Sequence, residues 1–284
     1  MRKLLVFIVA AIAFAVCASA QEGVPCTLKF QGQMREYILY LPERAEGAPL
    51  VIVAHGYGGN PERLFGIFKK AAAEQGFALC CPRGLKDPEG DCCWNVGYSF
   101  QLDTDPRDDV GFLCYLAATL QQEHSLGKAF FTGHSNGGDM SILLAYTHPE
   151  VFTAVAPIAG VTMEWEIRRL KPERPVPMMM IHGTADNVSF WDGDPLDKGK
   201  WGAYQSVPMT VANWATFNGC TYETVEELPL YTPESNKVLL HRYEGGVPLR
   251  FYEVVGGSHG TPVGDFDVAS EILSFFRSFA QNIR

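Results

Sequence analysis

The chain has 284 residues, of which 47% are hydrophobic, and it carries 23 Lys and Arg against 32 Asp and Glu. This length and composition can bury one large core, and nothing in the chain indicates a second domain, an internal repeat or a low-complexity linker. The formal net charge of −9 disfavours nucleic acid and anionic membrane as partners, because both repel an acidic surface.

The N-terminus has the pattern of a secretory signal peptide. Arg2 and Lys3 precede thirteen apolar residues at positions 4–16, and Ala18-Ser19-Ala20 forms an A-x-A cleavage site. Thirteen apolar residues are too few to span a bilayer comfortably, so a retained anchor is disfavoured. We therefore predict that residues 1–20 are removed.

Cleavage after Ala20 takes away two cations and no acid, so the net charge becomes −11. Cys17 raises the alternative of a lipidated N-terminus, but Val16 is bulkier than the small residue that such processing needs. The expected product is a single catalytic domain of residues 21–284, secreted or periplasmic and without membrane contact after cleavage.

The strand expected at residues 50–54 leads directly into the glycine-rich loop His55-Gly56-Tyr57-Gly58-Gly59. A plain turn into the helix that follows Pro61 does not explain three glycines. Such a loop can present backbone N–H groups to an oxyanion. We predict that the N–H of Tyr57 or of a neighbouring residue is one such donor, with the Tyr57 ring at the pocket mouth.

The central motif is Gly133-His134-Ser135-Asn136-Gly137, which fits the pattern G-x-S-x-G between a strand-like segment at 128–132 and a helix-like segment at 137–147. In this context the pattern indicates a nucleophile elbow, a sharp turn that presents the serine. Ser135 is the predicted nucleophile, and the N–H of Asn136 is the second predicted oxyanion donor. The alternative is a glycine-rich turn without chemistry.

The acid of a catalytic triad should follow a later strand. The apolar run at 176–181 ends in His182-Gly183-Thr184-Ala185-Asp186. Asp186 is predicted as the acid because only it directly follows the strand, whereas Asp192, Asp194 and Asp197 lie further on. A simple turn-forming role is the alternative for Asp186.

The histidine should come last, on a loop after the final strand. Residues 249–255 alternate and then break into Gly256-Gly257-Ser258-His259-Gly260. His259 is the predicted base, which would remove the Ser135 proton while Asp186 holds the imidazole tautomer. His241 lies inside a strand-like run and His182 precedes the acid, so both are weaker candidates.

Two loop segments carry aromatic residues outside any periodic element, at 82–107 and 189–208. Trp94, Trp191 and Trp201 are predicted to bind substrate, because aromatic rings stack well on phenolic rings and sugar faces. Tyr98 and Phe100 share this context. The alternative is that several of these rings only pack the loops onto the body.

Seven cysteines remain after cleavage, an odd number. Cys80 and Cys114 lie in apolar runs and are expected to be buried thiols. Export permits disulfides, and the sequence leaves the connectivity open among the remaining five: Cys26, Cys81, Cys92, Cys93 and Cys220. No histidine lies at ligand spacing from Cys92-Cys93, so no zinc or other metal site is predicted.

The predicted elements alternate between strands and helices. Strands are expected near 35–41, 50–54, 77–81, 128–132, 153–158, 176–181 and 249–255, and helices near 61–75, 109–123, 137–147, 209–217 and 268–279. Asp108 and Asp109 are expected to cap the second helix. This alternation is typical of an α/β fold with a doubly wound, mostly parallel sheet and helices on both faces.

An ordered set of motifs resembles the α/β-hydrolase group that joins secreted feruloyl esterases of carbohydrate esterase family 1 with polyhydroxybutyrate-depolymerase-like esterases. Besides the four site loops at 55–59, 133–137, 181–186 and 256–259, the set comprises residues 35–42, Asp108-Asp109-Val110-Gly111-Phe112, residues 155–160 and Asn218-Gly219-Cys220. The resemblance implies an α/β-hydrolase fold and a serine esterase with Ser135, Asp186 and His259 as its triad, and it calls for no cofactor.

The expected function is a secreted feruloyl esterase that acts on ester-bearing plant cell-wall polysaccharide, arabinoxylan in particular, or on a related small ester. Acetylxylan esterase and polyhydroxybutyrate-type polyester depolymerase are the enzyme alternatives, since members of this group cleave feruloyl, acetyl or polyester bonds. The non-enzyme alternative is a pseudo-hydrolase that binds glycan through its aromatic loops.

Overall fold

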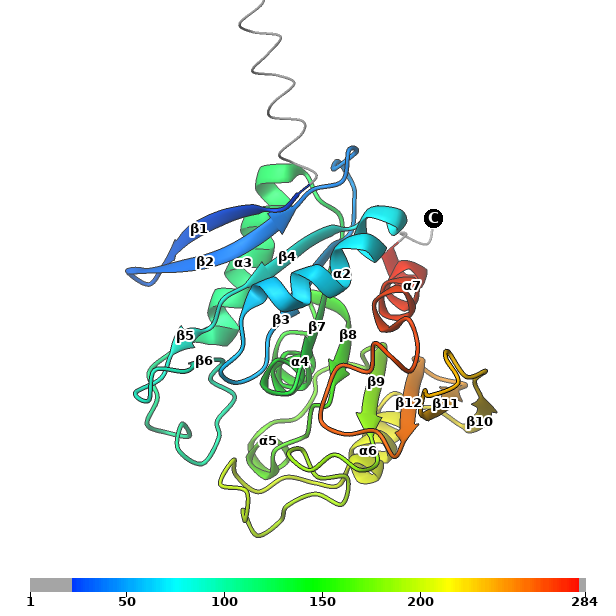
Figure 1. Ribbon diagram of the computed structural model, residues 1–284. Coiled ribbons are helices and arrows are strands. Elements are labelled where there is room, and N and C mark those ends of the chain that lie inside the picture. Colours follow the sequence, from blue (N-terminus) through cyan, green and yellow to red (C-terminus); the bar gives the residue numbers. More distant parts are fainter. Residues whose placement is uncertain (1–21, 281–284) are drawn as a thin grey trace, which may run out of the picture.

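A ten-stranded sheet organises the protein (Figure 1). The computed structural model describes residues 22–280, so the predicted signal peptide lies outside the described residues. The strands of this sheet are β1 (Val24–Phe30), β2 (Gln33–Tyr40), β3 (Leu50–Ala54), β4 (Ala78–Pro82), β7 (Ala129–His134), β8 (Phe152–Ile158), β9 (Met178–Gly183), β12 (Leu249–Val255), β11 (Lys237–Glu244) and β10 (Tyr222–Glu227).

The spatial order is β1-β2-β4-β3-β7-β8-β9-β12-β11-β10. The six central strands, β4 to β12, run parallel, and antiparallel strands extend the sheet at both edges. A separate short ribbon pairs β5 (Leu85–Lys86) with β6 (Cys92–Cys93). The carboxyl ends of the parallel strands therefore meet at one edge, where ligand sites of open α/β sheets form.

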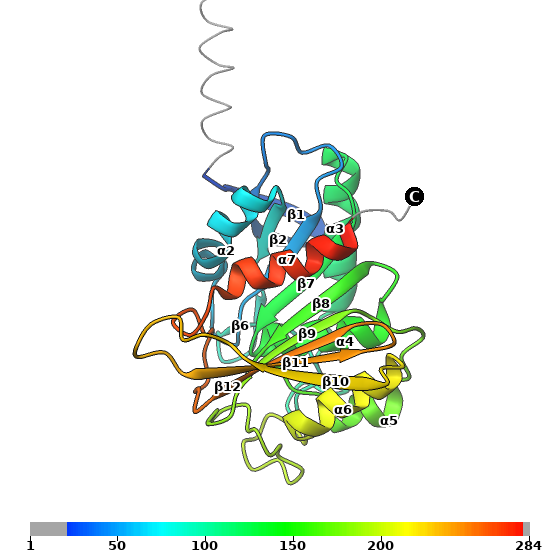
Figure 2. The same cartoon turned by 90° about the vertical axis from the view of Figure 1, so that its right-hand side faces the viewer.

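Helices cover both faces of the sheet (Figure 2). One face carries α2 (Pro61–Gln75) and α7 (Val268–Ala280), and the other carries α3 (Asp109–His124), α4 (Asn136–Thr147) and α6 (Val207–Phe217), while the short α5 (Glu164–Arg169) follows β8. Successive residues of β3 alternate between the two cores: Leu50 and Ile52 pack with α3 and α4, and Val51 and Val53 pack with α2 and α7. A strand buried on both faces must be apolar throughout, as this one is.

The predicted fold class is confirmed, and all seven predicted strands and five predicted helices are present with ends that differ by about one or two residues. The strands without a prediction are β1, β5, β6, β10 and β11, and α5 was also missed. Every residue of β10 is exposed, so it lacks the buried alternate face that makes a strand recognisable from its sequence.

Local signals set the helix ends. The side chain of Asn60 accepts a hydrogen bond from the N–H of Arg63 at the start of α2, and Gly76 ends this helix in the left-handed conformation. Asp108 caps α3 as predicted, through the N–H of Gly111 at 2.8 Å. The prediction for Asp109 is wrong, because its buried carboxylate instead forms an ion pair with Arg35 at 2.7 Å.

Candidate active site

Ser135 stands on a strained turn between β7 and α4, with φ 54° and ψ −119°. The close crossing of the two elements explains the flanking glycines. A Cβ atom at Gly137 would lie 2.2 Å from the carbonyl oxygen of Ala54, and one at Gly133 would lie 2.5 Å from Gly137. Only glycine fits at either position, so the motif holds a positive-φ serine at the end of a central strand.

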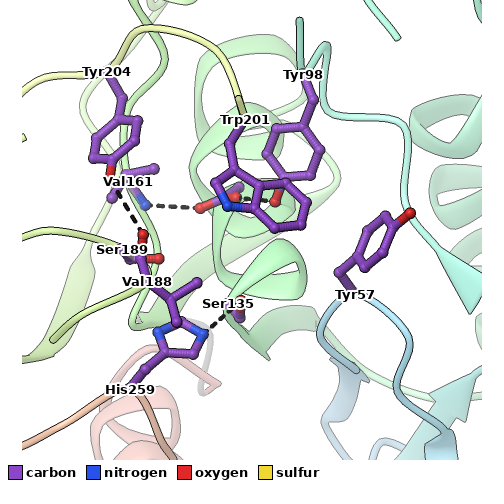
Figure 3. A pocket seen from close by; sticks show the side chains of 10 residues that line it. Tyr57, Tyr98, Ser135, Val161, Val188, Ser189, Trp201, Tyr204 and His259 are labelled. Carbon is purple, nitrogen blue, oxygen red and sulfur yellow. Dashed lines mark hydrogen bonds between the residues drawn. The ribbon is translucent and has the colours of Figure 1, made fainter. Parts of the chain in front are cut away.

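The structure brings the three predicted residues into one hydrogen-bonded chain. His259 Nε2 lies 2.9 Å from Ser135 Oγ (Figure 3), and His259 Nδ1 lies 2.8 Å from Asp186 Oδ2. With Nδ1 protonated toward the carboxylate, Nε2 is the acceptor for the serine hydroxyl. This geometry is that of a general base held by a buried acid.

The loops of Asp186 and His259 are joined by their backbones. The N–H of Ala185 donates to the carbonyl of Gly257 at 2.9 Å, and a Cβ at Gly183 would lie 2.2 Å from that same carbonyl oxygen. Since β9 and β12 are parallel neighbours, the two loops leave the sheet side by side. Asp186 and His259, which are 73 positions apart in the sequence, are thus held within hydrogen-bond distance.

Asp186 is a buried carboxylate with several donors. Its Oδ1 accepts from the N–H groups of Val188 and Ser189, both at 2.9 Å. Burial alone raises the pKa of Asp186, but the His259 hydrogen bond and charge, with the Val188 N–H, outweigh burial and hold this pKa below its ordinary value. The acid therefore stays ionised beside the imidazole.

The other aspartates and histidines considered for the triad have different partners. Asp194 accepts from the N–H of Gly199 and Asp197 from the N–H of Gly202, both at 2.7 Å, so both organise the 189–208 segment. His241 lies between Glu223 and Glu253 on the outer strands. His182 places Nε2 2.8 Å from the carbonyl of Ser189 and 3.4 Å from Asp186, which makes it a support for the acid loop.

Buried histidines around the triad are held neutral. Burial, reinforced by the neighbouring His259, lowers the pKa of His134 to about 3, and the two rings lie 5.0 Å apart. Burial also lowers the pKa of His182 and of His55. Neutral neighbours add no repulsion when His259 takes a proton.

The two predicted oxyanion donors lie on either side of Ser135. Asn136 is the first residue of α4, and its N–H is one of the amides that a helix leaves unpaired. The 55–59 loop passes directly over the serine, since a Cβ at Gly56 would lie 3.2 Å from Ser135 Cβ. Within residues 22–280, neither the N–H of Tyr57 nor that of Asn136 donates to any acceptor. Their role as oxyanion donors stays a prediction.

A cavity of about 210 Å³ opens at Ser135 and His259. Its walls are mainly aromatic: Tyr57, Tyr98, Trp201 and Tyr204 line it, together with Asp139, Val161, Val188 and Ser189 (Figure 3). The Trp201 ring centroid lies 5.1 Å from that of Tyr57 and 5.2 Å from that of Tyr98, in edge-to-face contacts. These three rings, here called the aromatic wall, come from three separate loops.

The prediction that Trp94 binds substrate is wrong. Its side chain is fully buried, and its indole N–H donates to the carbonyl of His55 at 2.9 Å. Its backbone exchanges hydrogen bonds with the side-chain amide of Asn136 at 2.7 and 3.1 Å. Trp94 therefore ties the 55–59 loop to the turn after Ser135 and has no face left for a ligand.

Trp191 and Trp201 differ in their positions. Trp191 stacks on Phe251 of β12 at 5.9 Å and lies outside the lining of the Ser135 cavity, and its binding role stays a prediction. Trp201 lines the cavity, as predicted for a substrate-binding residue. Its contact with substrate stays a prediction.

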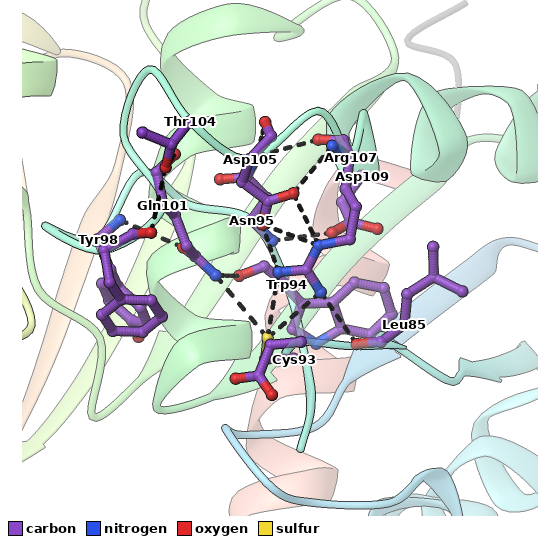
Figure 4. Close-up of polar contacts among 12 residues, drawn as sticks. Leu85, Cys93, Trp94, Asn95, Tyr98, Gln101, Thr104, Asp105, Arg107 and Asp109 are labelled. Atoms are coloured by element: carbon purple, nitrogen blue, oxygen red, sulfur yellow. Dashed lines mark hydrogen bonds and ion pairs between the residues drawn. The ribbon is translucent and has the colours of Figure 1, made fainter. Parts of the chain in front are cut away.

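The 82–107 loop is organised by polar contacts rather than by long regular elements (Figure 4). The Arg107 guanidinium pairs with Asp105 and donates to the carbonyl of Leu85 at 3.0 Å. The side-chain oxygen of Gln101 accepts from the N–H of Tyr98 at 3.2 Å. The loop is thus braced where it presents Tyr98 to the cavity.

The cysteines do not form disulfides among residues 22–280, where all seven are free thiols. Cys81 faces the core from the fully buried β4, and Cys93 accepts hydrogen bonds from Arg107. Cys26 and Cys220 donate to carbonyls of nearby backbone. The disulfides expected from the sequence are thus absent among the described residues.

Two further properties concern residues 22–280 alone. No helix in this range has the length and apolar character needed to cross a membrane. The same range contains no cluster of three or more His, Cys, Asp or Glu side chains that could hold a metal ion.

The chain was compared with known proteins to find what class of protein it resembles. No family model matches the chain. The chain is 29% identical over 237 residues to feruloyl esterase B of Piromyces equi, covering 79% of this chain and 42% of that protein. It is also 29% identical over 260 residues to the protein named "Putative esterase NocK" of Nocardia uniformis subsp. tsuyamanensis, covering 83% of this chain and 73% of that protein.

Among solved structures, acetyl xylan esterase from Aspergillus awamori aligns with a TM-score of 0.63 at 17% identity, over 90% of this chain and 99% of that one. The sheet and this alignment show that the chain has the α/β-hydrolase fold. The resemblance to the esterase group that includes feruloyl esterases is confirmed by the named relatives. The chain spans less than half the length of the Piromyces relative, so the activity and substrate of this chain do not follow from that protein's name.

Proposed function

We propose that the protein is a serine esterase that hydrolyses carboxylic esters through an acyl-enzyme on Ser135. The observation that carries this proposal is the continuous hydrogen-bonded chain from Ser135 through His259 to the buried Asp186. Asp186 can orient His259, and His259 can take the proton of Ser135. Ser135 and His259 line a cavity with space for an acyl group.

In the first half-reaction, Ser135 Oγ attacks the ester carbonyl while His259 Nε2 takes the hydroxyl proton. Asp186 stabilises the imidazolium, and the N–H groups of Tyr57 and Asn136 donate to the oxyanion. His259 then gives the proton to the departing alcohol. A water molecule repeats the sequence on the acyl-enzyme and releases the acid.

The proposed substrate class is the feruloyl ester of plant arabinoxylan. The aromatic wall of Tyr57, Tyr98 and Trp201 supports it, because these rings offer edges and faces to a phenolic ring. The relative from Piromyces equi, which bears the name feruloyl esterase B, supports it as well. Secretion is proposed from the signal pattern at residues 1–20.

Acetylxylan is the second candidate substrate, and the size of the cavity favours it. At about 210 Å³, the cavity is smaller than the roughly 300–1,000 Å³ of pockets for larger ligands. An acetyl group needs less room than a feruloyl group. The structural similarity to an acetyl xylan esterase agrees with this candidate but, at 17% identity, speaks only for the fold.

The deciding experiment compares hydrolysis of methyl ferulate, acetylated xylan and a hydroxybutyrate oligomer by the purified protein of residues 21–284. A feruloyl esterase releases ferulate with the highest kcat/KM. A preference for acetylated xylan would transfer the proposal to the second candidate. No hydrolysis of any of the three would contradict the proposed esterase.

A further inference from the structure

A buried carboxyl group lies next to the nucleophile without a role in the triad. Asp139 lies in the first turn of α4, four residues after Ser135. Both residues line the cavity, yet Asp139 is only 2% exposed. One aspartate in the first turn of a helix is ordinary, so the sequence alone does not mark Asp139 as a functional residue.

The contacts of Asp139 leave it partly unsatisfied. Its Oδ2 accepts from the Tyr98 hydroxyl at 2.6 Å and its Oδ1 from the N–H of Val161 at 2.8 Å. A carboxylate offers about four acceptor positions, so each oxygen keeps capacity for another donor. Among the described residues, no Lys or Arg forms an ion pair with Asp139.

Such a group is costly for the fold, since a buried carboxyl without a cation loses its hydration. Burial raises the pKa of Asp139 to about 7, against the lowering effect of the Tyr98 and Val161 hydrogen bonds. Protonated and ionised forms therefore coexist near neutral pH. A hydroxyl group both donates and accepts, so it can bond to either form.

We propose that Asp139 and Tyr98 form a recognition site for a hydroxyl group that the ester carries close to the bond being cleaved. The proposal rests on the proposed esterase function and deepens it. The Tyr98 oxygen, which donates to Asp139, can accept from the incoming hydroxyl, while a free position on Asp139 Oδ2 lies next to it.

The hydroxyl has two chemical sources in an ester. It belongs to the alcohol, as in a sugar with a free hydroxyl beside the esterified one, or to the acyl group, as in a 3-hydroxy acid. Both place a hydroxyl within a few bonds of the carbonyl carbon, which agrees with Asp139 and Ser135 lining the same cavity. Matched esters distinguish these sources.

The test measures kcat/KM for two pairs: 2-hydroxyethyl acetate against ethyl acetate, and methyl 3-hydroxybutyrate against methyl butyrate. We expect the wild-type protein to prefer the hydroxylated member of one pair by about 10-fold to 100-fold, the range for a hydrogen bond to a charged or strongly polarised group. That pair identifies the source. Equal rates within both pairs would overturn the proposal.

The variants Asp139→Asn and Tyr98→Phe should bring the preference ratio close to 1. Tyr98→Phe leaves the Asp139 bond to Val161 in place, so it tests the site even where Asp139→Asn does not fold. Tyr204→Phe is the matched control, because the hydroxyl of this cavity tyrosine bonds to the backbone of Phe190 and Val188 and not to Asp139, and it should keep the wild-type ratio.

Two other outcomes are distinct. If Tyr98→Phe lowers kcat/KM equally for both members of a pair, Tyr98 has a packing role. That result would overturn the hydroxyl site, while the esterase proposal stands. If the wild-type protein hydrolyses none of the four esters, both the esterase proposal and the hydroxyl site are contradicted.

Discussion

The triad and the aromatic wall share one cavity but are built in different ways. Ser135, Asp186 and His259 each follow a strand of the same parallel sheet, and the acid and histidine loops are joined by backbone hydrogen bonds. The wall combines Tyr57, Tyr98 and Trp201 from three loops, and its rings are held by edge-to-face contacts with one another.

This difference separates chemistry from selectivity. Glycines that admit no side chain fix the positions of the triad, so any change there should act on the chemical step. The wall depends on ring contacts, each of about 0.5–1.5 kcal/mol, so changes there should act on which ester binds.

The largest effect is expected from Ser135→Ala, which removes the attacking oxygen. We predict that kcat falls by about 10⁴-fold to 10⁶-fold, because the remaining groups cannot form an acyl-enzyme. The measurement is hydrolysis of a p-nitrophenyl ester, with circular dichroism to show that the fold is kept. A variant with a tenth of the wild-type rate would exclude Ser135 as the nucleophile.

Asp186→Asn should have the next largest effect, about 10³-fold to 10⁴-fold in kcat, because an amide stabilises the wrong histidine tautomer. Asp194→Asn is the control, since this carboxylate bonds to the N–H of Gly199 and not to His259. Its effect on kcat should be far smaller. The assignment of the acid fails if Asp194→Asn proves the more damaging change.

Acid should destabilise the fold through His134, the buried ring beside the triad. Burial lowers the pKa of His134 to about 3, below an unfolded value of about 6.5. The unfolded state thus binds more protons, so the stability from neutral His134 is present above about pH 6.5 and is lost as pH falls toward 3. Between pH 7.5 and pH 5 the loss is about 2 kcal/mol.

Urea unfolding at pH 7.5 and pH 5 checks this expectation. The wild-type protein should lose about 2 kcal/mol more free energy of unfolding than His134→Asn over this interval, because every other titrating group is common to both. An identical loss in the two proteins would show that His134 does not titrate as its burial implies.

The smallest effect concerns the wall. Trp201→Ala removes two edge-to-face contacts, so KM for methyl ferulate should rise about 3-fold to 10-fold while hydrolysis of an acetyl ester changes little. Trp191→Ala is its counterpart outside the cavity. Because Trp191 packs on Phe251, its loss should lower Tm without changing KM. If Trp201→Ala impairs hydrolysis of both esters equally and lowers Tm, Trp201 is a packing residue.

The sequence predicted the central strands and the positions of the triad residues because local signals are strong there. Apolar runs mark strands buried on both faces, and Gly133, Gly137 and the Gly256-Gly257 pair mark the turns that follow them. The exposed β10 carries no such signal, because none of its residues is buried.

The cavity wall was less predictable, because burial of a loop residue depends on contacts distant in sequence. Trp94 and Trp201 look alike in the chain, yet Trp94 is fully buried against His55 and Asn136, and Trp201 faces the cavity. Asp139 was missed for the same reason, since only the fold brings Tyr98 and Val161 to its carboxyl group.

The most direct test of the proposed mechanism is capture of the acyl-enzyme. The reaction is quenched with acid during turnover of p-nitrophenyl acetate. The protein is then digested, and the masses of its peptides are measured by mass spectrometry. We predict one acetyl group on the peptide that contains Ser135 and none on that peptide in Ser135→Ala. Steady turnover with no acylated Ser135, or with the acetyl group on another residue, would contradict the account.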